Sequence, residues 1–330
     1  MVNTDALKVE TGVLEAELKI YKLPALDLNI QQPVEDAAKR IFKECSQHLQ
    51  VNFQRFSTDQ NEKSLMQIRV GMRRTRVAFR IFQDIVPIET RKKFNKEFKY
   101  FGRCFGPARD LDELLFRMFG EPCANPELEI AYLELKSLTE QKRAQEYSSL
   151  CAELEEGRFA SLLEAFDEWV SGDWSAGRDL NAEKLVKAEI GPFAMDVIER
   201  DQKKLLKKAA SLDGRSVNEL HKVRKYVKRC RYQLRFFSSL FEKNKTLQGL
   251  SILGSLQNSL GAINDESIGL ALMTKFCGEV QAAHLPNCLS LIAAESLKAS
   301  MGTKAHLNDV ENLMRKYKEF TLAEADFGGL

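Results

Sequence analysis

Apolar residues recur along most of the chain at intervals of three and four positions, which is the spacing of one face of an α-helix. The segment VEDAAKRIFKECSQHLQVNFQRF after Pro33 follows this pattern. No alternating pattern typical of β-strands is evident, so the sequence predicts an all-α protein. The expected helices begin after Pro33 and then cover residues 61–85, 89–105, 109–119, 127–150, 154–171, 182–211, 216–243, 245–262, 265–282, 286–300 and 306–321, with breaks at Pro87, at Asp213 and Gly214, and at Pro286.

The length of the chain indicates more than one structural unit. At 330 residues it exceeds what one hydrophobic core usually organises. Pro24 and Pro33 interrupt any helix near the start, and the stretch from Ser171 to Gly177 is typical of a boundary. We therefore expect an N-terminal arm at residues 1–30, a first helical bundle at 31–175, a second at 176–322 and a C-terminal tail at 323–330.

One segment of the chain returns 155 residues later. It begins at Leu65 as LMQIRVGMRRTRVAFRIF and returns at Leu220 as LHKVRKYVKRCRYQLRFF, without a gap. The chain is therefore expected to contain a duplicated helical unit. The offset pairs Arg69 with Arg224, Arg73 with Lys228, Arg74 with Arg229, Arg76 with Arg231, Arg80 with Arg235 and Phe82 with Phe237.

A shorter pair of segments follows the two copies at the same offset. The segments CFGPARDLD and SLGAINDES align Gly106 with Gly261 and Asp110 with Asp265. Glycine is typical of a helix end and aspartate of an N-cap, so each half is expected to have a turn here between two helices. The aspartates are also candidates for orienting arginines of the repeat.

The repeat places cations along one face of each helix, because an α-helix advances by about 100° per residue. Like charges at this spacing repel by about 0.2–0.5 kcal/mol per pair, so an anion has to offset the repulsion. Arginine grips phosphate with two hydrogen bonds, and successive residues of a row follow a chain with repeated negative charge. The first row is Arg69, Arg73, Arg76 and Arg80, and the second row is His221, Arg224, Lys225, Lys228, Tyr232 and Arg235, with Arg229 and Arg231 at its flanks.

A row of cations can also be a solvated face, or it can pair with carboxylates of neighbouring helices. Repetition in register, in two segments that lack carboxylates from residue 68 to 82 and from 221 to 241, favours anion binding. Arg103 and Arg109 are additional candidates for the first site. Lys204 and Lys208 belong to a basic helix face that either binds anions or is solvated.

Charge and cysteine content narrow the class of protein. The net charge is only +2, so an anion site requires local segregation of charge. The seven cysteines show no C-x-x-C spacing and are expected to be reduced core residues. Without a signal peptide or a run of eighteen apolar residues, we expect a cytoplasmic protein that does not span a membrane. No Walker A motif or His/Cys cluster predicts a cofactor or a metal.

At the two rows the sequence resembles the CHAD family, the conserved histidine α-helical domain. The family is marked by two copies of H-x-x-R-x-x-x-[RK]-R-x-R, each followed by L-G-x-x-[RN]-D, and both copies are present here. The resemblance spans roughly residues 33–320. It implies two pseudo-symmetric antiparallel helical bundles around a basic central cavity, and an association with inorganic polyphosphate.

Matching positions extend the resemblance to individual residues. Lys225 and Tyr232 are not implied by the resemblance, and we add them to the predicted phosphate contacts because they belong to the second row. Met66 replaces the histidine of the first copy, so a metal site of two histidines is not expected. An association with polyphosphate granules follows from the resemblance alone. The implied phosphate contacts are Arg69, Arg73, Arg74, Arg76 and Arg80 in the first copy, and His221, Arg224, Lys228, Arg229, Arg231 and Arg235 in the second.

Three functions compete for these residues. The leading hypothesis is non-enzymatic binding of inorganic polyphosphate, with an affinity that falls steeply with salt. Nucleic acid is the second candidate partner, although base stacking requires exposed aromatic residues and Tyr232 is the one clear candidate. The third is a polyphosphate-processing enzyme or a metal chelator that uses His221, but no neighbouring carboxylate is evident that would orient this histidine. We therefore expect a binding protein and not an enzyme.

Overall fold

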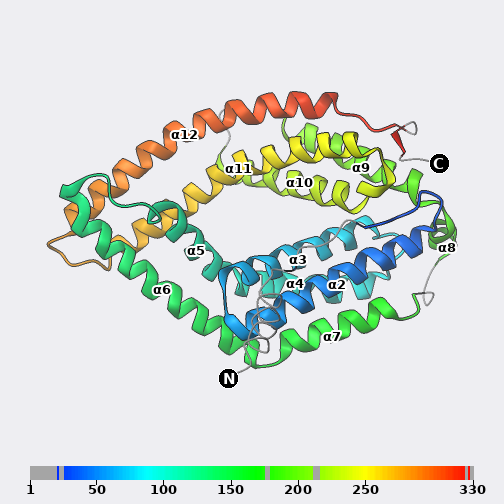
Figure 1. The fold of residues 1–330 in the computed structure, drawn as a ribbon, viewed down its shortest axis with the longest axis horizontal. Coiled ribbons are helices and arrows are strands. Elements are labelled where there is room, and N and C mark those ends of the chain that lie inside the picture. Colours follow the sequence, from blue (N-terminus) through cyan, green and yellow to red (C-terminus); the bar gives the residue numbers. More distant parts are fainter. Residues whose placement is uncertain (1–20, 22–25, 175–178, 211–215, 324–325, 328–330) are drawn as a thin grey trace, which may run out of the picture.

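The computed structural model describes residues 21, 26–174, 179–210, 216–323 and 326–327, which exclude the break predicted at Asp213 and Gly214. The described chain is mostly helical, so the predicted all-α class is confirmed. The helices are α2 (Val34–Asp59), α3 (Glu62–Ile81), α4 (Ile88–Cys104), α5 (Gly106–Met118), η1 (Pro126–Leu128), α6 (Glu129–Glu155), α7 (Arg158–Ser171), α8 (Leu180–Lys187), α9 (Ile190–Lys208), α10 (Val217–Phe236), η2 (Ser238–Leu240), α11 (Lys243–Cys277) and α12 (Leu285–Glu319) (Figure 1).

The helices form two groups (Figure 1), and an opening lined by α3 of the first and α10 of the second lies between them. In the first group α2 packs against α3 and α7, and α3 packs against α4. In the second group α11 packs against α10 and α12, and α9 packs against α10. α5 and α6 lie at one end of the opening and contact α11, so they connect the two groups there. This arrangement places α3 and α10 on opposite sides of the opening.

α3 and α10, which contain the two rows, have matching bounds. Both ends of α10 follow those of α3 by 155 positions, because Glu62 corresponds to Val217 and Ile81 to Phe236. α3 begins with an N-cap, in which Oδ1 of Asn61 accepts a hydrogen bond from a backbone N–H at 2.7 Å. α10 begins with a capping box, in which Glu219 accepts from the backbone N–H of the N-cap residue at 3.0 Å.

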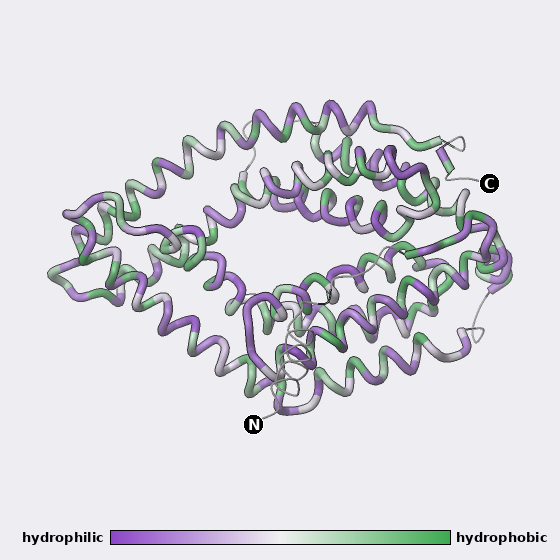
Figure 2. The backbone as a smooth tube through the Cα atoms, in the orientation of Figure 1, coloured by the Kyte–Doolittle hydropathy of each residue, from purple (hydrophilic) through white to green (hydrophobic). Residues whose placement is uncertain are grey.

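Buried side chains of both groups form one continuous core. Phe42 of α2 packs on Phe79 of α3 with ring centroids 4.8 Å apart. The repeat partners Phe82 and Phe237 follow α3 and α10 and contact each other with centroids 6.5 Å apart. A smaller buried cluster joins α5 and α6 to α11 and α12. Hydrophobic and hydrophilic positions alternate along these helices (Figure 2), and α3 and α10 each bury an apolar side in the core.

Residues 26–34 connect the start of the chain to the second half. The N–H of Leu28 donates to Oγ of Ser239 at 2.9 Å. The N–H groups of Ile190 and Gly191 donate to the carbonyl oxygens of residues 32 and 30, both at 3.0 Å. The described end of the predicted N-terminal arm therefore holds the second helical group against the first.

The turn predicted at Gly261 is wrong, because α11 runs without a break from residue 243 to 277. Only the first half is broken, where α4 ends and α5 begins at Gly106. The difference is explained by Pro107, whose counterpart in the repeat is Ala262. Proline has no N–H with which to continue the hydrogen bonding of α4 and is suited to the first turn of a new helix, whereas alanine propagates a helix.

Two other predicted boundaries are also wrong. The helix expected over 182–211 is divided into α8 and α9, because Ala188 is extended and its carbonyl oxygen accepts from the N–H of Val34 at 2.9 Å. The helices expected over 286–300 and 306–321 form the single helix α12. Gly302 lies inside it, since one glycine costs a helix only about 1 kcal/mol.

Candidate functional site

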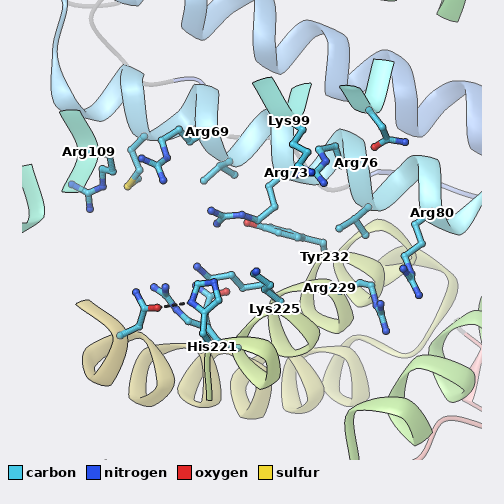
Figure 3. A pocket seen from close by; sticks show the side chains of 18 of the residues that line it. Arg69, Arg73, Arg76, Arg80, Lys99, Arg109, His221, Lys225, Arg229 and Tyr232 are labelled. Carbon is cyan, nitrogen blue, oxygen red and sulfur yellow. Dashed lines mark hydrogen bonds between the residues drawn. The ribbon is translucent and has the colours of Figure 1, made fainter. Parts of the chain in front are cut away.

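A cavity of about 960 Å³ lies between α3 and α10. Its wall contains eleven arginine and lysine side chains and three carboxylates, Asp110, Glu113 and Asp265. Residues of both rows point toward one another across it (Figure 3). A chain with a net charge of only +2 thus concentrates its cations at one place.

α3 supplies the first row to this cavity. Its opposite face, which includes Leu65, Ile68 and Met72, is buried in the core. The apolar face fixes the rotation of the helix and turns the polar stripe toward the opening. All four members of the first row line the cavity: Arg69, Arg73, Arg76 and Arg80.

α10 supplies the facing wall. Its buried residues include Val223, Val227 and Leu234, so the second row is turned toward α3. The hydroxyl of Tyr232 makes no hydrogen bond with any described residue, although this side chain is only 9% exposed. The residues of α10 that line the cavity are His221, Arg224, Lys225, Lys228, Arg229 and Tyr232.

Several cavity cations are held by protein groups. Nη1 of Arg69 donates to the carbonyl oxygens of Phe105 at 2.7 Å and Gly106 at 2.9 Å, where α4 meets α5. Nη2 of Arg224 donates to both oxygens of Asp265, at 3.2 and 3.3 Å. Arg109 and Arg229 pair with Glu113 and Asp201, respectively. These contacts orient the side chains and satisfy part of their hydrogen-bonding capacity.

Other cavity cations lack such partners. Within the described chain, Arg73, Arg76, Arg80, Lys225 and Lys228 make no hydrogen bond or ion pair. Unpaired cations that face one another repel, and partial burial strengthens the repulsion because it reduces screening by water. This arrangement therefore favours the binding of negative charge in the middle of the cavity.

The pKa of Lys228 shows the effect of these surroundings most clearly. Burial, together with the charges of Arg73 and Arg224, lowers the pKa of its amine from 10.5 to about 6, although Asp265 opposes this shift. Burial also lowers the pKa of Arg69, to about 10. An anion in the cavity would favour the charged form of both side chains.

His221 is oriented by an amide. Its Nδ1 lies 2.5 Å from Oδ1 of Asn264, whose Nδ2 donates to Asp265 at 3.0 Å. Because the amide nitrogen faces the carboxylate, the amide oxygen faces the ring, and Nδ1 carries the hydrogen. Burial lowers the pKa of His221, and Lys225 and Arg224 lower it further, while the bond to Asn264 opposes this. These effects together favour the neutral form of the imidazole.

Three predicted residues of the repeat do not reach the cavity. Arg74 is buried in the core, where its guanidinium lies 4.9 Å above the ring of Phe236. Arg231 donates to Gln257 at 3.2 Å, and Arg235 is exposed outside the cavity. These residues point to other sides of α3 and α10, since they lie at the flank or the end of a row.

Of the additional candidates, only Arg109 lines the cavity. Arg103 and Lys208 are exposed elsewhere, on α4 and α9. Lys204 lies 3.9 Å from the buried carboxylate of Asp201, so its charge balances that group and it does not face the cavity. The basic face of α9 is therefore separate from the two rows.

The aspartates after the rows do not cap helices, contrary to the prediction. Asp110 lies inside α5 and Asp265 inside α11. Burial raises the pKa of Asp110, and the charge of Arg69 opposes this shift. The expectation that these aspartates orient arginines is met directly by Asp265, which binds Arg224. Both carboxylates therefore act on the first arginine of a row.

Sequence reasoning missed one wall of the cavity, which α4 provides. Arg91, Asn95 and Lys99 line the cavity from this helix. Their spacing of four residues in an amphipathic segment was a usable signal. It also missed Asn264, which orients His221.

Two further features are absent from the described residues. No three His, Cys, Asp or Glu side chains come together in a way that could hold a metal ion. No helix in this part of the chain is long and apolar enough to cross a membrane.

The chain is similar to known proteins over most of its length. The family model of the CHAD domain matches residues 40–274. The crystal structure of the CHAD domain from the plant Ricinus communis matches with a TM-score of 0.76 and 24% identity, over 90% of this chain and 97% of that chain. PptA from Streptomyces chartreusis matches with a TM-score of 0.64 and 13% identity, over 86% of this chain and 100% of that chain. No curated protein sequence matches.

Proposed function

The chain belongs to the CHAD family, and we propose that it binds inorganic polyphosphate in the cavity between α3 and α10 without altering it chemically. One observation supports this most strongly: Arg73 and Arg76 of α3 and Lys225 and Lys228 of α10 line the same cavity, and none of the four makes an ion pair in the described chain. A bound polyanion would offset the repulsion between the positive charges of the cavity wall.

The shape of the charged surface favours a linear polymer over a single small anion. The first row extends from Arg69 to Arg80, and eleven residues of α-helix span about 16 Å. A cavity of about 960 Å³ is also larger than one phosphate ion needs. Arginine residues along such a surface can each bind a separate phosphate group of one chain with two hydrogen bonds.

The aromatic residues argue against nucleic acid as the main ligand. Phe79 and Tyr232, which line the cavity, are buried, with exposures of 0% and 9%. Single-stranded nucleic acids are commonly held by exposed rings on which bases stack. Polyphosphate has no bases and needs no such ring.

The surroundings of His221 favour binding over catalysis. Its partner Asn264 is a neutral amide, whereas catalytic histidines are commonly oriented by a carboxylate that stabilises the charged ring. A phosphate oxygen near Nε2 would favour the imidazolium form, which donates a hydrogen bond to it. We therefore assign His221 a binding role.

Competition with product analysis tests the proposal. Polyphosphate should displace labelled single-stranded DNA at far lower concentration than DNA displaces labelled polyphosphate, and the polymer should keep its length. The reverse order would make nucleic acid the ligand, and shortened chains would make the protein an enzyme. In a cell, the proposed ligand would bring the protein to polyphosphate granules in the cytoplasm, which a fluorescent fusion would reveal.

A further inference from the structure

α4 presents a polar stripe to the same cavity. Arg91, Asn95 and Lys99 are four residues apart and therefore lie on one side of the helix. The other side of α4, with Phe94 and Phe98, is buried in the core. Packing of the phenylalanines thus fixes which side of α4 faces the cavity.

The members of this stripe have no partners within the described chain. Arg91, Asn95 and Lys99 make no hydrogen bond or ion pair there, and Nε of Arg91 is shielded from solvent without an acceptor. Lys92, on the same helix, is instead neutralised by Glu89 at 2.9 Å. Lys99 lines the same cavity as Arg76 of the first row (Figure 3), so a polymer in the cavity can contact both cations.

The second half of the repeat has no equivalent stripe. At an offset of 155 residues, Arg91, Asn95 and Lys99 correspond to uncharged residues of α11. α11 lines the cavity with Gln257, Asn264 and Asp265 instead. The wall from α4 is therefore positive, whereas the wall from α11 is neutral to negative, although the two rows themselves are matched.

We infer that the α4 stripe is a third binding wall for the phosphate polymer, along which the chain continues after it passes between α3 and α10. This inference rests on the proposed function. A polyanion follows the side of a cavity with the more positive potential, which here is the side of α4. Arg91 and Lys99 supply the charge, and the amide of Asn95 supplies an additional donor.

The α4 stripe should matter more for long polymers than for short ones. Eight residues separate Arg91 from Lys99, or about 12 Å along the helix. A short oligophosphate can be neutralised by the two rows alone, whereas a longer chain reaches α4 as well. The stripe thus sets a preference for chain length that α3 and α10 do not provide by themselves.

The test is calorimetric titration of the full chain with long-chain polyphosphate and with tripolyphosphate at several salt concentrations. The double variant Arg91→Ala, Lys99→Ala is compared with Lys93→Ala, Lys96→Ala, which removes two exposed lysines of α4 that lie outside the cavity. The first variant should bind the long polymer roughly tenfold more weakly and lose about 1–2 units of the salt slope. The control and all titrations with tripolyphosphate should change by less than about twofold.

The outcomes are distinguishable. If wild-type protein binds the polymer and the Arg91, Lys99 variant binds it equally well, the α4 inference is wrong and the proposed function stands. If wild-type protein does not bind, the proposed function fails first. If the double variant unfolds, Lys99→Glu is compared with Lys93→Glu in its place. Both side chains are exposed, so these variants should fold.

Discussion

Nη2 of Arg224 lies 3.2 Å from one carboxylate oxygen of Asp265 and 3.3 Å from the other. Asp265 also accepts from Asn264 and lies 3.8 Å from Arg117, so it connects α10 and α5 to α11. It is at the same time one of the few negative charges in a cavity proposed to bind an anion. Its roles in stability and in binding should therefore oppose each other.

The variant Asp265→Asn should lose stability and gain affinity. Removing the charged partner of Arg224 should lower the free energy of unfolding by about 1–3 kcal/mol. Polyphosphate should bind several-fold more tightly, since repulsion is removed and Arg224 becomes available. Urea unfolding and calorimetry measure the two effects. Glu295→Gln, which breaks the exposed pair with Lys298, is the control, and an Asp265→Asn protein with unchanged affinity would refute this role.

Polyphosphate binding should take up protons through Lys228. The pKa of this lysine is about 6, so without bound polyphosphate it is neutral at pH 8. A bound phosphate raises that pKa, so the complex takes up about one proton and affinity falls as pH rises above 6. Calorimetry in buffers of different ionisation enthalpy measures the uptake. The variant Lys228→Arg keeps a permanent charge and should therefore abolish the proton uptake. An equal proton uptake in that variant would contradict the prediction.

The imidazole of His221 should report the ligand directly. Burial and neighbouring cations hold its pKa below the ordinary value, and a bound phosphate should raise it. NMR titration of the four histidines in the chain measures this. His48, whose pKa burial lowers to about 4, lies in the core and should not respond. A pKa of His221 that stays the same at saturating polyphosphate would place the ligand elsewhere.

Two glycine substitutions should have opposite effects on stability. A Cβ at Gly71 of α3 would lie 2.7 Å from Cδ2 of Leu49 and 2.8 Å from Nδ1 of His48 on α2. Gly71→Ala should therefore destabilise the protein by about 1–3 kcal/mol. At Gly102 of α4 no atom lies within 4 Å of such a Cβ, so Gly102→Ala should stabilise by up to about 1 kcal/mol. Thermal and urea unfolding compare the two, and equal effects would show that α2 does not pack closely on α3.

α3 and α10 were predictable because two independent signals agree on them. The repeat defines α3 and α10 by a common offset, and the apolar positions define which side of each helix is buried. Cations on the remaining side then had to face one another or the solvent. Ten of the thirteen predicted contacts consequently line one cavity, although their binding role remains a prediction.

The remaining features depend on tertiary contacts that no local pattern encodes. Arg74 belongs to the repeat, yet it packs on Phe236 because α3 and α10 approach each other closely. α8 ends at Ala188 because residue 34 binds there from a distant part of the chain. The amphipathic pattern of α4 indicated which side is polar, but only the assembled bundle shows that Lys99 lines the same cavity as Arg76. The break at Pro107 and its absence at Ala262 could have been predicted from the two residues alone.

The most direct test of polyphosphate binding in the cavity is titration of the double variant Arg73→Glu, Lys228→Glu with long-chain polyphosphate. These residues are repeat partners on opposite walls of the cavity, so both walls become repulsive. Lys96→Glu, Lys208→Glu makes the same change of charge on exposed lysines outside the cavity. Binding should fall by roughly 100-fold or more in the first variant, with an unchanged helical signal, and by much less in the second. Equal loss in both, or retained binding in the first, would contradict a site between α3 and α10.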